Sequence, residues 1–166
     1  RSTNRGDSQR GFENTTLERK RASILEDVAH GVRFLHAFQP AVIHGDLKSR
    51  NVLLDSRFGA KVTDFGLSAK RDFGAAGTPF WMAPELFKEK ASNSKSTDAY
   101  AFGVLIFETV ALVDPYEGED PDTVIRDVCN PTIDKRPAMP ADAPSKLKEL
   151  AEKCWSSDPK KRPSFE

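Results

Sequence analysis

Four polar side chains of the types that phosphate chemistry uses lie between residues 46 and 64: Asp46, Lys48, Asn51 and Asp64. A carboxylate on a rigid loop can orient a hydroxyl group and accept its proton, which suits Asp46. The amide oxygen of Asn51 and the carboxylate of Asp64 are hard ligands that suit Mg²⁺. Lys48 follows Asp46 closely enough to point the same way and neutralise a transferred phosphate. The set predicts metal-assisted phosphoryl transfer.

Two short apolar segments are expected to bring two of these residues together. Val52–Leu54 and Lys61–Thr63 are predicted strands, and the intervening Ser-Arg-Phe-Gly stretch at 56–59 predicts a turn. Because a hairpin pairs its two ends, we expect Asn51 and Asp64 to lie side by side.

An amphipathic helix is predicted before this hairpin. Thr15 and Glu18 form a capping box. Apolar residues then recur at helical spacing to about Ala37: Ile24, Val28, Val32 and Leu35. Residues 1–15 are polar and lack an apolar period, so we expect that segment to be disordered.

Three further helices are predicted after the hairpin. A mainly apolar stretch capped by Ser96 or Thr97 predicts a buried helix to about Val110. Asp120-Pro121 is an N-cap followed by a first-turn proline, and residues 147–155 carry a last helical face. Residues 67–78 are small and polar with no period, which predicts a mobile loop. The expected fold is α+β, mostly helical, with one small hairpin beside the polar set.

The composition indicates one ordinary globular domain and excludes several other classes. Lys plus Arg equals Asp plus Glu at 25 each, which argues against a nucleic-acid binder that works by bulk positive charge. Cys129 and Cys154 make neither a disulfide framework nor a zinc pattern, so we expect a reducing, cytoplasmic location. The richest apolar run, Ala99–Val113, is shorter than the roughly 20 residues that cross a bilayer, so we expect no membrane contact within this segment.

The order of these residues resembles the protein kinase superfamily. Residues 44–51 (His-Gly-Asp-Leu-Lys-Ser-Arg-Asn), 64–66 (Asp-Phe-Gly) and 83–85 (Ala-Pro-Glu) match its motifs in sequence order. The resemblance covers about 16–166 and corresponds to the C-terminal lobe of the catalytic domain. No glycine-rich loop or strand lysine precedes it, so the expectation is a truncated kinase domain over 16–166 whose N-terminal lobe is absent.

The resemblance implies a role for each polar residue. Asp46 would be the catalytic base and Lys48 would contact the γ-phosphate of ATP. Asn51 and Asp64 would hold Mg²⁺, and Leu53 would lie under the adenine. ATP and Mg²⁺ are therefore the expected cofactors, and proteins are the expected substrates.

Other matching residues are implied to be structural. His44 and Phe65 would pack beneath the site, and Asp98 would anchor the backbone of the catalytic loop. Glu85 and Arg162 would form a buried ion pair that ties the activation segment to the lower lobe.

The residue types at several positions within and near these motifs resemble the tyrosine-kinase-like group of serine/threonine kinases. Lys48 is typical of serine/threonine kinases, and Thr78 would bridge it to Asp46. Residues 49–51 and 154–155 resemble the tyrosine-kinase-like group. The expected activity is transfer of the γ-phosphate of ATP to Ser and Thr hydroxyls of protein substrates.

One departure from the family pattern concerns regulation. Gly45 replaces the arginine that usually precedes the catalytic aspartate and pairs with a phosphate on the activation segment. We therefore expect activity that phosphorylation of residues 64–85 does not switch. Two functions stay open: an active kinase, favoured by the intact polar set, and a non-catalytic kinase-like lobe that binds partner proteins, favoured by the missing lobe and Gly45.

Overall fold

The computed structural model describes residues 5–65 and 77–166, with side chains described from residue 16 onward. In this part of the chain, the helices are α1 (Arg5–His36), α2 (Lys95–Ala111), α3 (Pro121–Cys129) and α4 (Ser145–Cys154). The strands are β1 (Val52–Leu54) and β2 (Ala60–Val62). Short 3-10 helices lie at Ser49–Asn51, Pro79–Trp81, Pro84–Phe87 and Pro159–Lys161. The expected α+β, mainly helical architecture is confirmed for these residues.

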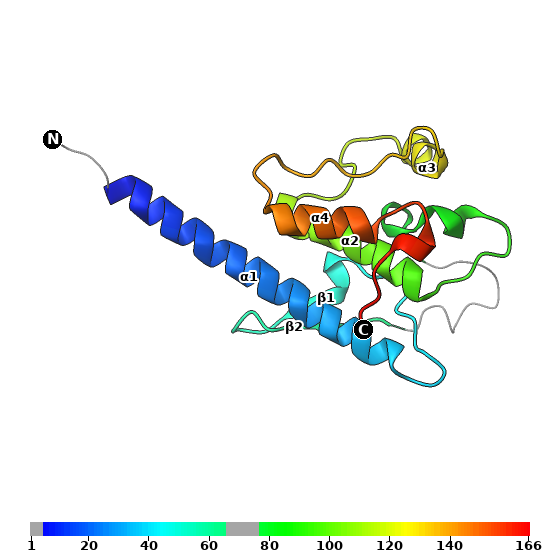
Figure 1. Ribbon diagram of the computed structural model, residues 1–166, viewed down its shortest axis with the longest axis horizontal. Helices are drawn as coiled ribbons and strands as arrows, with labels where there is room; N and C mark the ends of the chain where they lie inside the picture. The colour runs from blue at the N-terminus through cyan, green and yellow to red at the C-terminus, as the bar shows by residue number, and fades with distance from the viewer. Residues whose placement is uncertain (1–4, 66–76) are drawn as a thin grey trace.

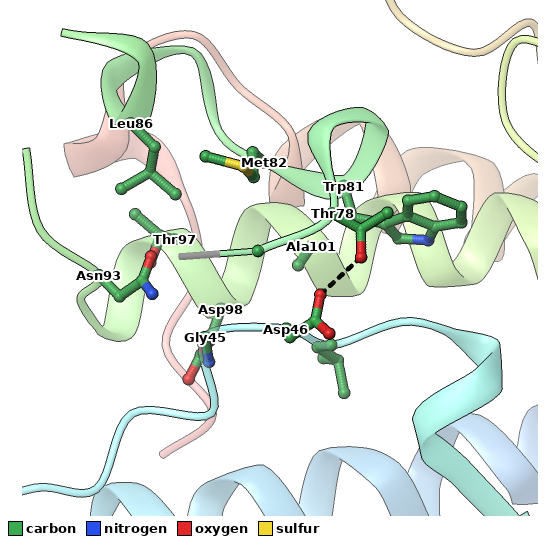
Figure 2. A pocket seen from close by; sticks show the side chains of 12 residues that line it. Gly45, Asp46, Thr78, Trp81, Met82, Leu86, Asn93, Thr97, Asp98 and Ala101 are labelled. Carbon is green, nitrogen blue, oxygen red and sulfur yellow. Dashed lines mark hydrogen bonds between the residues drawn. The ribbon is translucent and has the colours of Figure 1, made fainter. Parts of the chain in front are cut away.

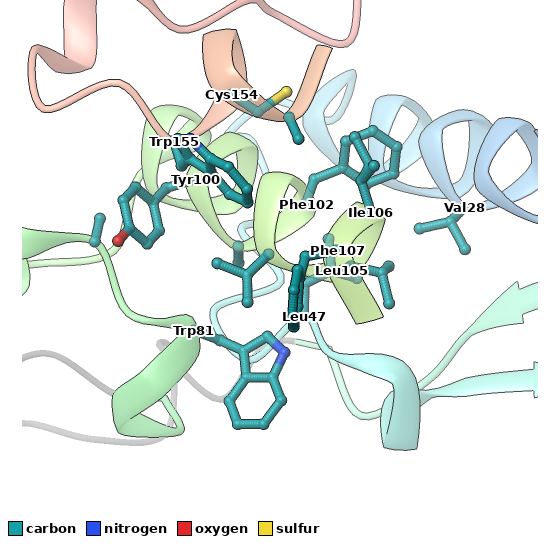
Figure 3. Packing of buried hydrophobic residues seen from close by; sticks show 14 of the residues in the cluster. Val28, Leu47, Trp81, Tyr100, Phe102, Leu105, Ile106, Phe107, Cys154 and Trp155 are labelled. Atoms are coloured by element: carbon teal, nitrogen blue, oxygen red, sulfur yellow. The ribbon is translucent and has the colours of Figure 1, made fainter. Parts of the chain in front are cut away.

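Helix α2 lies at the centre of the core, between α1 and α4 (Figure 1). Its sequence is apolar on every side, which is the pattern of a fully buried helix. Figure 3 shows its aromatic and aliphatic side chains surrounded by Val28 of α1, Trp81, and Cys154 at the end of α4. Gly103 permits the close approach of α4, because a Cβ atom there would lie 2.9 Å from the Cβ of Cys154.

Helix α1 begins at Arg5, so the prediction of a disordered segment is wrong for residues 5–15. The capping box at Thr15 and Glu18 lies inside the helix instead of starting it. No proline interrupts the segment, and the helix therefore continues N-terminally from the part that packs on the core. The N-terminal part of α1 projects away from the other elements (Figure 1).

The predicted hairpin is confirmed, with its second strand one residue earlier than expected. Strands β1 and β2 are antiparallel and pair Leu53 with Lys61. Asp55 forms the turn by accepting hydrogen bonds from the backbone N–H groups of Arg57 (2.7 Å) and Gly59 (2.9 Å). The hairpin lies against α1, where the Asp27 carboxylate accepts the N–H of Ala60 at 2.9 Å.

The start of α2 corrects another prediction. Its N-cap is Ser94, not Ser96 or Thr97. The Ser94 hydroxyl accepts the Thr97 N–H, and the Thr97 hydroxyl accepts the Ser94 N–H at 2.9 Å, a reciprocal capping box. The predicted cap of α3 is confirmed, because Asp120 accepts the N–H of Thr123 at 2.9 Å.

Two further predictions concern a loop and the membrane. Most of the loop predicted at 67–78 lies outside the described residues, which resume at Gly77. Among the described residues, no helix is both long enough and apolar enough to cross a bilayer.

Candidate active site

Asp46, Lys48 and Thr78 form a closed hydrogen-bonded triangle. The Lys48 ammonium donates to the Asp46 carboxylate at 2.8 Å and to the Thr78 hydroxyl at 2.5 Å. The Thr78 hydroxyl donates to the other Asp46 oxygen at 2.8 Å, as the dashed line in Figure 2 marks. The predicted bridge from Thr78 to both residues is therefore confirmed. It fixes the Asp46 carboxylate in one orientation.

Asn51 joins the same cluster from the start of the hairpin. Its amide nitrogen donates to the Asp46 backbone carbonyl at 2.7 Å and to the Asp46 carboxylate at 3.2 Å. Because the nitrogen is engaged in this way, the amide oxygen is the atom left to act as a ligand. Asn51 is buried, so its orientation is held by these contacts.

Asp64 lies next to Asn51 through the pairing of the hairpin ends. The Thr63 N–H donates to the Asn51 carbonyl at 2.9 Å, which brings the residue after Thr63 to this end of the hairpin. Asp64 is exposed and has a φ of 56°, a left-handed conformation that aspartate tolerates better than most residues. Leu53, the remaining predicted site residue, lies on β1 with 60% of its area exposed.

Asp46 is ionised at neutral pH. Partial burial would raise the pKa of its carboxyl group, but hydrogen bonds from Lys48 and Thr78 and the charge of Lys48 outweigh that effect. The resulting pKa is lower than that of an ordinary aspartate. The cluster therefore presents a fixed carboxylate anion beside an ammonium group.

Asp98 of α2 holds the backbone that leads into Asp46. Its carboxylate accepts the N–H groups of His44 at 2.8 Å and Gly45 at 2.9 Å, and it pairs with the His36 ring at 2.8 Å. Asp98 is 1% exposed, so these three donors satisfy a buried carboxylate. The predicted anchor is confirmed. Gly45 has a φ of 80°, a left-handed conformation that glycine adopts without strain.

The two residues expected to pack beneath the site differ in burial. His44 is fully buried, and its Nδ1 accepts the N–H of Asp46 at 3.3 Å. Burial lowers the pKa of His44 in spite of the nearby charges of Asp98 and Asp46, so the ring is neutral at pH 7. Phe65, in contrast, is 52% exposed, so the prediction that it packs beneath the site is wrong for the described residues. It directly precedes residues outside the described range.

Glu108 is a structural member of the site that the motif comparison missed. This buried α2 residue accepts the Ser49 N–H at 3.1 Å, the Ser49 hydroxyl at 2.6 Å and the Trp81 indole N–H at 2.7 Å. It thereby joins the loop that carries Lys48 to the segment that carries Thr78. A carboxylate in the middle of an apolar stretch was the available signal, since a buried charge requires partners.

The predicted ion pair between Glu85 and Arg162 is present. The two guanidinium Nη atoms reach the two carboxylate oxygens at 2.6 and 2.8 Å, a bidentate geometry. Arg162 is buried and also donates to the backbone carbonyls of Ser96 and Ser156. The pair ties the segment after Thr78 to the C-terminal end of the chain.

The chain is similar to known protein kinases over nearly its whole length. The family described as protein tyrosine and serine/threonine kinase matches residues 8–166. Serine/threonine-protein kinase CTR1 of Arabidopsis thaliana is 41% identical over 157 residues, covering 89% of this chain and 18% of that protein. Receptor-interacting serine/threonine-protein kinase 3 of Rattus norvegicus is 42% identical over 164 residues, covering 86% of this chain and 33% of that protein.

A third relative, dual specificity protein kinase shkA of Dictyostelium discoideum, is 38% identical over 156 residues, with 88% of this chain and 29% of that protein covered. The chain thus spans between 18% and 33% of the length of these three relatives. The match extends through the Asp46 cluster, the Asp98 anchor and the Glu85–Arg162 pair. This chain therefore belongs to the protein tyrosine and serine/threonine kinase family, in its tyrosine-kinase-like group.

Proposed function

We propose that this chain forms the C-terminal lobe of a serine/threonine protein kinase, which transfers the γ-phosphate of ATP to Ser and Thr hydroxyls of protein substrates. The observation that carries the proposal is the Asp46 carboxylate, held by Lys48, Thr78 and Asn51 in one orientation. Relatives named as serine/threonine or dual specificity protein kinases support the same activity.

Asp46 is the residue that would receive the substrate hydroxyl. Its lowered pKa keeps it ionised, so it can accept a hydrogen bond from the hydroxyl before reaction. A carboxylate of low basicity takes the proton only when the hydroxyl oxygen becomes acidic on bonding to phosphorus. Asp46 would therefore orient the nucleophile first and accept its proton late in the reaction.

Lys48 would stabilise the transferred group. Its ammonium contacts Asp46 and Thr78, so it would face a phosphoryl group that approached a hydroxyl bound to Asp46. A point charge there attracts the phosphoryl oxygens as they gain negative charge in the transition state. Thr78 keeps this ammonium and the carboxylate at fixed separation, which is a positioning role.

The residues present fit Mg²⁺ and ATP. Asn51 offers an amide oxygen whose partner nitrogen is already engaged, and Asp64 offers an exposed carboxylate at the same end of the hairpin. Bound Mg²⁺ would neutralise phosphate oxygens there. Leu53 would give the adenine an apolar contact, which accounts for a leucine exposed on a two-stranded hairpin.

Two asparagine substitutions in the full-length protein test these roles. Asp46→Asn should abolish phosphate transfer to a protein substrate and leave Mg²⁺-ATP affinity nearly unchanged in a calorimetric titration. Asp64→Asn should weaken Mg²⁺-dependent nucleotide binding as well. Asp142→Asn, at an exposed loop position, is the matched control and should change neither quantity.

The outcomes separate the two functions. Phosphate transfer that survives in Asp46→Asn would remove that residue as the base. An unsubstituted full-length protein that binds no Mg²⁺-ATP would instead favour the non-catalytic lobe that binds partner proteins.

A further inference from the structure

A cleft of about 360 Å³ opens beside the proposed transfer site. Its lining includes Lys48 and Thr78, two of the residues that hold Asp46. The cleft is also lined by residues of the segment from Asp114 to Pro121, which leads from α2 into α3 (Figure 1). A chain whose hydroxyl reached Asp46 would place its neighbouring residues in this cleft. The volume is in the range of side-chain and small-ligand sites.

The connecting segment gives the cleft a negative wall. Residues 114–122 contain five carboxylates and no lysine or arginine. Three of the five line the cleft: Asp114, Glu117 and Glu119. Two cations also line the cleft: Lys48 is already paired with the Asp46 carboxylate at 2.8 Å, and Arg50 lies 3.7 Å from Asp114. The sign of the field in the cleft is therefore set by the carboxylates.

Glu117 is the carboxylate whose charge is available to a ligand. Asp114 lies 3.7 Å from Arg50, and Glu119 lies 2.5 Å from Lys135. Glu117 is exposed and forms no ion pair within the ranges that the structure describes. Arg50 also lines the cleft, but its proximity to Asp114 offsets its charge.

The remaining cleft surface suits the carbon stem of a long basic side chain. Phe80, Trp81, Pro115 and Tyr116 line the cleft. The rings of Phe80 and Tyr116 pack edge to face with centroids 5.6 Å apart, which fixes this surface. Lysine and arginine place their methylene groups on such surfaces and keep their charge at a polar rim, and arginine also stacks on aromatic rings.

We propose that Glu117 selects protein substrates that carry an arginine or lysine close to the phosphorylated Ser or Thr. This inference rests on the proposed function, because Asp46 defines where the substrate hydroxyl lies. The basic side chain lies along the aromatic wall, and its cation pairs with Glu117 at the rim. A substrate with glutamate at the same position meets repulsion from the same wall.

Peptide phosphorylation by the full-length protein tests the proposal. A peptide with one Ser is prepared with Arg, Gln or Glu at each neighbouring position in turn, and kcat/KM is measured at low and high salt. The unsubstituted protein should prefer Arg over Gln at one or more positions, with a smaller preference at high salt.

Two Glu117 variants give the decisive comparison. Glu117→Gln should reduce the Arg preference about threefold, as expected for one partly exposed charge pair. Glu117→Lys should reverse the preference, so that the peptide with Glu is phosphorylated with a higher kcat/KM than the peptide with Arg. Asp122→Asn, an exposed acid in the first turn of α3 that does not line the cleft, is the matched control and should keep the Arg preference.

Two results would overturn the proposal. The first is equal kcat/KM for the Arg, Gln and Glu peptides, and the second is an Arg preference that survives in Glu117→Lys. Binding of the same peptides with Ala in place of Ser, followed by fluorescence anisotropy, separates this proposal from the proposed function. Arg-dependent binding that Glu117→Lys abolishes, without phosphate transfer, supports the cleft and contradicts the kinase activity. Phosphate transfer without any charge preference supports the kinase activity and contradicts the role of the cleft.

Discussion

Replacing Glu108 with alanine should destabilise the protein by about 3 kcal/mol, because the buried Trp81 indole and the neighbouring Ser49 lose the acceptor that they have among the described residues. The carboxylate is 7% exposed and accepts hydrogen bonds from the Ser49 N–H, the Ser49 hydroxyl and the Trp81 indole N–H. The hydroxyl can rotate toward another acceptor, but the two N–H groups cannot. The buried indole N–H left without a partner costs about 1–3 kcal/mol, and each lost hydrogen bond from the exposed Ser49 costs about 0.5–1.5 kcal/mol, which together give the expected magnitude.

Equilibrium unfolding in urea, followed by tryptophan fluorescence, measures this loss. Trp81 contacts Glu108 directly, so its emission reports the same region. Glu149→Ala is the matched control: this glutamate lies on α4, is exposed and pairs only with Lys153 within the described residues. An exposed pair of this kind contributes little, so the unfolding midpoint should stay nearly unchanged.

Glu108→Gln refines the test. Glutamine keeps the side-chain volume and one carbonyl oxygen but turns an NH₂ group toward a donor. The stability of Glu108→Gln should therefore lie between that of the unsubstituted protein and that of Glu108→Ala. The rate of phosphate transfer should also fall in Glu108→Ala by more than the folded fraction explains, because Ser49 directly follows Lys48. Equal midpoints for Glu108→Ala and Glu149→Ala would refute the assignment of Glu108 as an anchor.

Three further predictions concern the loop around Asp46. Thr78→Val should slow phosphate transfer by about tenfold or more, and Thr78→Ser should restore most of the rate, because the hydroxyl bonds two charged groups. Phosphatase treatment of the full-length protein should change the rate by less than about tenfold, since Gly45 offers no cation to a phosphate. The melting temperature should fall as the pH drops below 6.5, the ordinary pKa of histidine, because burial lowers the pKa of His44 in the folded state and the unfolded chain takes up the proton first. His44→Gln should flatten this dependence.

The hairpin and the polar cluster could be predicted because their signals are local. Two short strand-forming segments with a turn between them determine which residues are paired, so Asn51 and the residues beside Asp64 had to meet. The start of α1 was not predictable in the same way. Its first residues carry no apolar period, and the absence of a helix breaker is a weaker signal than a cap.

The cap of α2 and the role of Glu108 depend on tertiary context. Ser94, Ser96 and Thr97 are all acceptable caps by residue type, and the backbone of the preceding segment selects Ser94. The sequence places Glu108 in an apolar helix but contains no signal that pairs it with Ser49 and Trp81, which are far from it along the chain. Such partners follow from the packing of three elements, not from spacing within one.

The position of Asp46 depends on the core as much as on its own hydrogen bonds. Asp98 and Glu108 lie at two places along α2 and hold the two ends of the loop, at His44 and Ser49. Helix α2 is buried and pressed against α4, so it cannot shift without disturbing the whole apolar cluster. The two buried carboxylates therefore transmit the rigidity of the core to a polar loop at the surface. This arrangement explains why an apolar helix contains acidic side chains that a core built for stability alone would exclude.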